Sequence, residues 1–433
     1  MKYIFNRIYI WLSNLQSKIA FYPSLFAIFG FLFAIFLIYT EDLGISTYLL
    51  KTAPILVVDN GNTALSILTA CITGLISMMV FSFSMVMVML NQAASNYSPR
   101  LLPGLISDKN HQIILGIYLS TIIYCIFISL SIQPDGNAYQ VPGFSVLLGI
   151  LFTVLSLSAF IYFIHNISQS IQIENILDRI FNQAETRLNV LLKNEEEETP
   201  TFPETKNWYE YHAERSGYLQ NLSSDNIIKL CKKAETRLEI LPIKGIFVPK
   251  GIPMFRSEKK LDDETAKKIL SNFSLSRGEL VTQNYVLAFK QITEVIAKAM
   301  SPGINDPGTA LNALDYLTEL FALRMKKRDK QYLLDKEGEE EKVVIKMRTV
   351  SFEELLYNIM APIRAYCKHD IIIVQKLGRM FSYLKSQEVA NEHYLKVLDQ
   401  EALNLFADAD ANIDNKADQK TLHKIARQLS LKI

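Results

Sequence analysis

The sequence predicts an integral membrane protein: four transmembrane helices come first, and a cytoplasmic α+β region with a small β-barrel-like module and a helical bundle follows. Charge is distributed unevenly, because residues 1–173 hold 11 charged side chains and residues 174–433 hold 78. The first part also contains four stretches without charge that reach the ~20 residues a spanning helix needs. The second part has the charge content of a water-soluble domain.

The four expected spans make up a transmembrane domain over residues 19–166. They lie within four uncharged stretches, at about residues 19–39, 60–99, 112–132 and 144–164. Each is expected to be a helix, because a segment surrounded by lipid must satisfy its own backbone hydrogen bonds.

Basic residues indicate the orientation of these spans. The N-terminal segment and the loop between the second and third spans carry five Lys and Arg residues, whereas the other two loops carry one. By the positive-inside rule, both termini are expected in the cytoplasm of a multi-pass protein of the bacterial inner membrane. Residues 1–18 gather their apolar side chains on one face, which predicts an interfacial amphipathic helix; a longer first span is the alternative.

One face of the second span carries hydroxyl and amide side chains. At 100° per residue, six of them fall within about 60° of a common direction over about 38 Å: Ser66, Thr69, Thr73, Ser77, Ser84 and Asn91. Helix–helix packing explains such a face, because small hydroxyl residues let neighbouring helices approach closely. The lining of a water path between several copies of the chain also explains it.

Two further motifs contain candidate functional residues. The membrane-exit motif after the second span comprises Tyr97, Ser98, Pro99 and Arg100, of which Arg100 would bind lipid phosphate or close a contact between subunits. The cytoplasmic motif comprises Ser301, Pro302, Gly303, Asn305, Asp306 and Pro307. It suits a cation, a polar ligand or a neighbouring chain. Capping alone also explains it, with Asp306 as the N-cap of the next helix.

Three segments make up the expected cytoplasmic half. Residues 167–213 indicate a connecting helix and a linker, and residues 258–433 a mainly helical domain with a β-hairpin near 331–348. Between them, residues 214–257 alternate apolar residues with Gly and Pro, which predicts a small β module. Its stretch GIFVPKGIPM resembles the half-motif of barrel-sandwich hybrid domains of the biotinyl and lipoyl type, which implies a barrel-like fold.

Composition and motifs argue against several classes of function. The net charge of +1 is not that of a nucleic-acid-binding protein, and the six histidines and four cysteines lack metal-ligand spacing. The chain contains no P-loop, GxGxxG, HExxH or GxSxG motif, so we expect neither enzyme activity nor a cofactor. The expected partners are the lipid bilayer, further copies of this chain, and a cytoplasmic protein or small ligand.

Six stretches, in this order, resemble one known family: NQAASNYSPRLL, ILGIYLSTIIY, FIHNISQSIQ, SGYLQNLS, GIFVPKGIPM and AMSPGINDPGTALNALDYL. Together they are similar to bacterial predicted membrane proteins of the domain-of-unknown-function 2254 family, over about residues 1–400. The resemblance implies an integral membrane protein with four spans and a cytoplasmic domain. It implies no particular activity.

The first functional hypothesis is therefore a homo-oligomeric channel or pore-like protein whose second span lines the path. The alternative is a non-conducting membrane sensor or scaffold whose cytoplasmic domain binds a ligand or a protein partner. These hypotheses differ in where the hydroxyl face of the second span points, and in what the large cytoplasmic half binds.

Overall fold

The computed structural model describes residues 20–41, 43–52, 55, 57–58, 60–96, 109–132, 141–170, 172–193, 202–277, 284–329, 331–335 and 342–430. The chain divides into two compact units, Met1–Gln172 (unit 1) and Ile173–Ile433 (unit 2). The predicted interfacial helix at residues 1–18 and the membrane-exit motif Tyr97–Arg100 lie outside the described residues.

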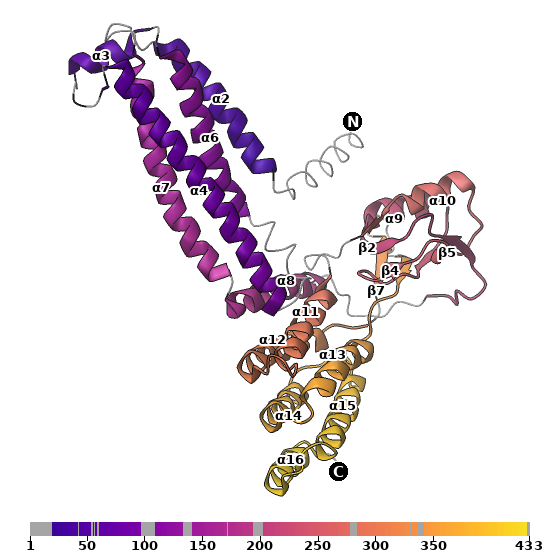
Figure 1. Ribbon diagram of the computed structural model, residues 1–433. Coiled ribbons are helices and arrows are strands. Elements are labelled where there is room, and N and C mark those ends of the chain that lie inside the picture. The colour runs from indigo at the N-terminus through magenta and orange to yellow at the C-terminus, as the bar shows by residue number, and fades with distance from the viewer. Residues whose placement is uncertain are drawn as a thin grey trace. The chain divides into compact units, whose positions relative to one another are not determined.

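The described part of unit 1 is helical (Figure 1). Its helices are α2 (Phe21–Glu41), α3 (Ile45–Thr52), α4 (Gly61–Asn96), α6 (Lys109–Ser131) and α7 (Gly143–Ser170). Four of them, all except the short α3, are long and apolar enough to cross a membrane, which confirms the four predicted spans. With 36 residues, α4 is about 54 Å long and exceeds the ~30 Å of a hydrocarbon core.

Helix α6 lies at the centre of the bundle, in contact with α2, α4 and α7. In its apolar 18-residue stretch, 44% of the residues are buried, against 17–22% in the corresponding stretches of the other three spans. The approach of α2 to α6 is close: a Cβ atom added at Gly30 would lie 2.4 Å from the carbonyl oxygen of Ser120. Glycine therefore permits the contact between these two backbones, as small residues do at helix interfaces in lipid.

The carboxylate of Glu41 binds the first turn of α7. Glu41 accepts hydrogen bonds from the backbone N–H and the hydroxyl of Ser145, at 2.9 and 2.8 Å, and from the Ser46 hydroxyl at 2.5 Å. The Ser46 hydroxyl in turn accepts from the backbone N–H of Phe144 at 2.9 Å. The first amides of α7, which have no partner within the helix, are thus satisfied by side chains from α2 and α3.

The described residues of unit 2 form two open sheets. The first has the order β1-β5-β3-β8-β7, and the second has the order β4-β2-β6. The strands are β1 (Tyr209–His212), β2 (Gly217–Leu222), β3 (Leu238–Ile240), β4 (Phe247–Val248), β5 (Pro253–Ser257), β6 (Phe273–Ser276), β7 (Gln331–Asp335) and β8 (Lys342–Met347). Strands β3 and β8 pair in parallel, and all other described pairs are antiparallel.

The prediction of a β-barrel-like module is wrong. Neither sheet closes within the described residues, and strands from outside 214–257 complete both: β1, β7 and β8 join the first and β6 joins the second. The predicted hairpin near 331–348 is present as the antiparallel pair β7–β8. Gly245 and Gly251 do have the positive φ values of 82° and 86° expected for tight turns, but these turns separate short strands of open sheets.

Two short helices, α9 (Ser224–Lys233) and α10 (Asp263–Leu270), contribute to the core of this β region. The core consists mostly of aliphatic side chains around Phe255. The ring of Phe255 stacks on Tyr211 and on Phe273, with centroid distances of 4.8 and 6.2 Å.

Seven helices form the rest of the described part of unit 2. They are α8 (Ile173–Lys193), α11 (Tyr285–Ala299), α12 (Pro307–Met325), α13 (Phe352–Cys367), α14 (Ile371–Lys385), α15 (His393–Asp410) and α16 (Lys416–Gln428). Helix α8 packs on α11 and α12, and α13 to α16 continue the packing (Figure 1). Asp306 caps α12 as predicted, by accepting from the backbone N–H of Thr309 at 3.1 Å.

Candidate functional site

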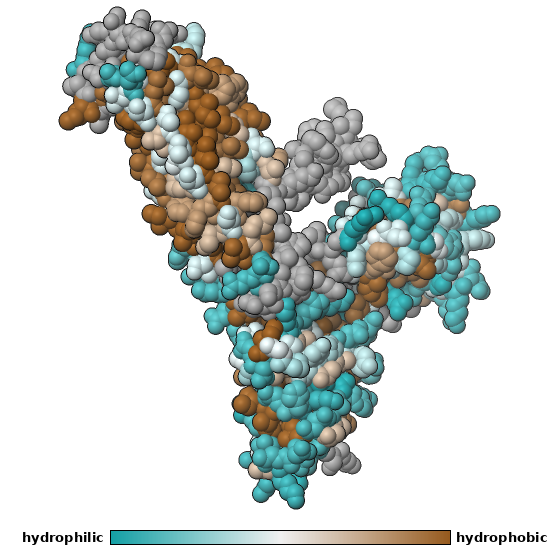
Figure 2. Space-filling model, viewed as in Figure 1, coloured by the Kyte–Doolittle hydropathy of each residue, from teal (hydrophilic) through white to brown (hydrophobic). Residues whose placement is uncertain are grey.

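The hydroxyl face of α4, defined as Ser66, Thr69, Thr73, Ser77, Ser84 and Asn91, is exposed along its whole length in the single protomer. In Figure 2 a pale band crosses the brown surface of the bundle along α4. The hydroxyls of Ser66, Thr73, Ser77 and Ser84 donate to the backbone carbonyls four residues earlier, at 2.8–3.0 Å. These side chains are thus not packed between helices of one protomer.

The opposite face of α4 holds the helix in the bundle. Leu68, Leu75, Ser82 and Met89, spaced seven residues apart, are at most 1% exposed. Leu68 packs in one buried cluster with residues of α2, α6 and α7, and Met89 packs in another with residues of α6 and α7. At 100° per residue this buried row lies on the far side of the helix from the hydroxyl face. The protomer therefore directs its hydroxyl face outward.

The cytoplasmic motif forms an exposed corner between α11 and α12. Ser301 donates its hydroxyl proton to the carbonyl of Lys298 at 2.7 Å, and Asn305, at a φ of +48°, donates its N–H to the carbonyl of Ser301 at 3.0 Å. The N–H of Asp306 donates to the carbonyl of Ala299 at 2.7 Å. Hydrogen bonds from Thr309 hold the pKa of Asp306 below its usual range. Backbone and capping bonds thus specify this turn.

Metal-ligating side chains do not gather in the described residues, where no group of three or more His, Cys, Asp or Glu could hold an ion. The structure places Ser301, Pro302, Gly303, Asn305, Asp306 and Pro307 together at the corner, and Pro302, Gly303, Asn305 and Asp306 are exposed. A role for them in binding a ligand or a neighbouring chain stays a prediction.

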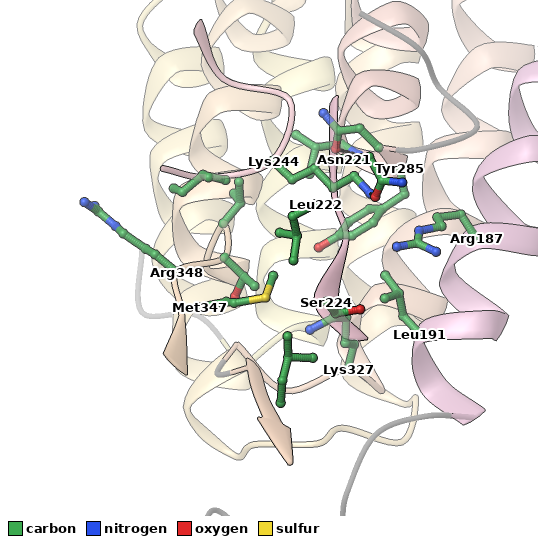
Figure 3. Close-up of a pocket in the computed structure, with 16 residues that line it drawn as sticks. Arg187, Leu191, Asn221, Leu222, Ser224, Lys244, Tyr285, Lys327, Met347 and Arg348 are labelled. Carbon is green, nitrogen blue, oxygen red and sulfur yellow. Dashed lines mark hydrogen bonds between the residues drawn. The ribbon is translucent and has the colours of Figure 1, made fainter. Parts of the chain in front are cut away.

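A pocket that sequence reasoning missed lies inside unit 2 (Figure 3). Its volume is about 160 Å³, and its lining comes from α8, from β2 and the start of α9, from the turn before β4, from the start of α11, and from residues around 327 and 333–350. Four basic side chains line it, namely Arg187, Lys244, Lys327 and Arg348, and no described lining residue is acidic.

Two of these cations, Arg187 and Lys244, lie close enough to interact electrostatically. Burial and the neighbouring Arg187 guanidinium lower the pKa of Lys244 to about 8. Burial also lowers the pKa of Arg187, but a guanidinium stays charged at any ordinary pH. The ammonium of Lys244 donates to Asn221 Oδ1 at 3.1 Å, a neutral acceptor. The pocket is therefore a region of positive potential.

Backbone bonds position Lys244 over this pocket. The N–H of Gly245 donates to the carbonyl of Leu219 at 2.8 Å, and the N–H of Leu219 donates to the carbonyl of Ile246 at 3.2 Å. A Cβ atom at Gly245 would lie 1.6 Å from Asn284 Nδ2, so only glycine lets this turn approach the start of α11. Gly245 is the first residue of the stretch GIFVPKGIPM, whose sequence had suggested a barrel-like fold and not a pocket.

Comparison with known proteins shows the following similarities. A family model described as a predicted membrane protein (DUF2254) matches residues 16–383. Uncharacterised proteins from Mycobacterium bovis and Mycobacterium tuberculosis are 23% identical over 346 residues, which cover 75% of this chain and 66% of each relative. The chain thus spans about two thirds of the length of these relatives. No solved structure matches the chain.

Proposed function

We propose that this chain, which belongs to the DUF2254 family of predicted membrane proteins, forms a homo-oligomeric channel or pore-like assembly in which α4 lines the path. The observation that supports this proposal is the outward direction of the hydroxyl face of α4 in a single protomer. Copies arranged with these faces inward would enclose a path lined by hydroxyl groups.

The composition of α4 fits a path of low selectivity. The hydroxyl face runs for about 38 Å, longer than the ~30 Å hydrocarbon core. No Asp, Glu, Lys or Arg occurs between Asp59 and Arg100, so no ring of charge would select cations or anions within the span. Rings of hydroxyl and apolar side chains would conduct small solutes when wetted and close when dewetted.

Electrical recording from the purified protein in planar bilayers tests the proposal. Ser77→Leu should reduce conductance strongly, because a bulky apolar side chain would narrow the middle of the path and exclude water from it. Ser158→Leu on α7 is the matched control, since Ser158 is also exposed and donates to the carbonyl four residues earlier. Absence of conductance, or a Ser77→Leu protein that conducts like the wild type, would refute the channel.

The second candidate function is a non-conducting membrane sensor or scaffold. The cationic pocket of unit 2 favours it, because a ligand-binding cavity is not needed to conduct. A purified full-length protein that binds an anionic ligand but passes no current would support this candidate over the channel.

We also propose that both termini lie in the cytoplasm. The N-terminal segment and the second loop carry five basic residues, whereas the other two loops carry one, and basic loops stay on the cytoplasmic side. The same asymmetry would place unit 2 in the cytoplasm of a bacterial cell and its spans in the inner membrane.

A further inference from the structure

We infer that the surface around β4 is a contact site for an anionic lipid bilayer, because exposed apolar side chains and exposed basic side chains lie together there. The apolar side chains are Ile246, Phe247 and Ile252, which are 40%, 48% and 46% exposed. The basic residues are Arg215 and Lys250. We call these five residues the β4 patch. The inference concerns unit 2 and does not depend on whether the chain conducts.

Backbone hydrogen bonds bring the two basic residues of the β4 patch to one place. The N–H of Gly251 donates to the carbonyl of Ala213 at 2.9 Å. The N–H of Lys250 donates to the hydroxyl oxygen of Ser216, also at 2.9 Å. The segment that carries Arg215 therefore lies against the turn that carries Lys250.

Strand β4 directs one of its two side chains into the core and the other to the surface. Val248 is 3% exposed and belongs to the core of the β region, whereas Phe247 points to the opposite side of the strand. Phe247 pairs with Tyr218 of β2, and their rings meet edge-on with centroids 5.3 Å apart. The sheet thus holds the Phe247 ring at the surface. Three large exposed apolar side chains within seven residues mark a contact surface, since single ones are usually scattered.

The charge near the β4 patch indicates what covers it. In residues 215–222 and 240–253 the charged side chains are Arg215, Lys244 and Lys250, with no Asp or Glu; Glu214 precedes the first of these segments. Within the described residues, no ion pair involves Arg215 or Lys250. Apolar side chains flanked by basic ones bind the interface of anionic bilayers, because the apolar groups enter the boundary of headgroups and acyl chains while the cations attract the headgroups.

Size and covalent attachment favour a bilayer over a protein as the partner. A stable protein interface buries ~800 Å² on each side through ~20–30 residues, far more than three apolar side chains offer. Two residues separate the end of the span α7 at Ser170 from the start of α8 at Ile173, the first helix of unit 2. This attachment gives unit 2 a high effective concentration of lipid, so a weak contact is enough. The contact would be a second attachment of unit 2 to the membrane.

Quenching of tryptophan fluorescence by brominated lipid tests the contact in the full-length protein. Phe247→Trp replaces one exposed aromatic ring by another, and Ile252→Trp is a second reporter in the β4 patch. Tyr357→Trp, at a position of α13 that is 57% exposed, is the matched control. Each emission is measured as the difference from the wild type, which has two tryptophans. In nanodiscs of phosphatidylglycerol, brominated acyl chains should quench both reporters in the patch and leave Tyr357→Trp unchanged.

The dependence on charge tests the basic part of the β4 patch. Brominated phosphatidylcholine, which has no net charge, should quench Phe247→Trp less than brominated phosphatidylglycerol does. Lys250→Gln and Arg215→Gln, each added to Phe247→Trp, should lower the ratio of bound to unbound patch by ~5-fold, because each removes one cation near the surface. Lys420→Gln, which changes an exposed lysine of α16, should leave this ratio unchanged.

The inference is overturned if both reporters of the β4 patch keep their emission in brominated phosphatidylglycerol, or lose no more than Tyr357→Trp loses. An emission from Phe247→Trp that shifts to shorter wavelength without quenching would indicate a second copy of the chain or another protein on the patch, and would also overturn it. Quenching that is equal in the two lipids and unaffected by Lys250→Gln and Arg215→Gln would refute the anionic character of the partner.

Discussion

Replacing Lys244 by Gln should stabilise the ligand-free protein at pH 7. The folded protein lowers the pKa of Lys244 from 10.5 to about 8, so holding its charge in the fold costs free energy. At 1.36 kcal/mol per pKa unit the full cost would be ~3 kcal/mol. Lys244 is only partly buried, and solvent screening reduces the expected gain to about 1–2 kcal/mol.

The direction in which stability changes with pH follows from proton binding. Between about pH 8 and pH 10.5 the unfolded chain keeps the Lys244 proton while the folded protein has lost it. The unfolded state thus binds more protons in this range, and the stability of the wild type should rise with pH. Below about pH 8 both states are protonated and the repulsion is fully present. Gln carries no charge at any pH, so the variant should lack this rise.

Thermal unfolding at a fixed heating rate, in steps from pH 7 to pH 9.5, measures the stability gain of the variant and the rise of wild-type stability with pH. The other basic side chains among the described lining residues are Arg187, Lys327 and Arg348. We expect the variant to melt about 2–6 °C higher than the wild type at pH 7. A variant that melts lower, or that keeps the wild-type rise with pH, would refute the reasoning.

Three further predictions follow from single contacts. Gly30→Ala should destabilise unit 1 by about 1–3 kcal/mol, because the added methyl group meets the α6 backbone, whereas Gly74→Ala has open space and should melt like the wild type. Asp306→Ala should lower stability by about 0.5–2 kcal/mol by removing the hydrogen bond from Thr309, and Asp306→Asn should keep most of it. Arg379→Cys, at an exposed position on α14, should react with a membrane-impermeant thiol reagent only after the cells are opened; labelling of intact cells would reverse the proposed orientation.

Local chemistry accounts for the predictions that the structure confirms. The four spans follow from runs of apolar residues, and the cap at Asp306 follows from a side chain that accepts a hydrogen bond from the N–H group three residues later. Each of these features depends on residues within about one turn or one span of each other. Nothing distant along the chain had to be known.

The failed barrel prediction shows the opposite case. Glu239 of β3 pairs in parallel with Lys346 of β8, more than one hundred residues later in the chain, and their side chains form an ion pair at 2.9 Å. The apolar alternation of β3 is compatible with an open sheet or a barrel, because periodicity gives the faces of a strand but not its neighbours. The β module of residues 214–257 is therefore only part of two larger sheets.

The order of apolar and charged residues along the chain was by itself enough to determine a protein with four spanning helices, since lipid leaves a backbone no partner but itself. Only the tertiary structure decided that the hydroxyl face of α4 points away from the protomer, because packing on α6 and α7 selects which side of the helix is buried. It also brought Arg187 and Lys244 together at one pocket, since the potential between two like charges depends on their distance in space and not along the chain.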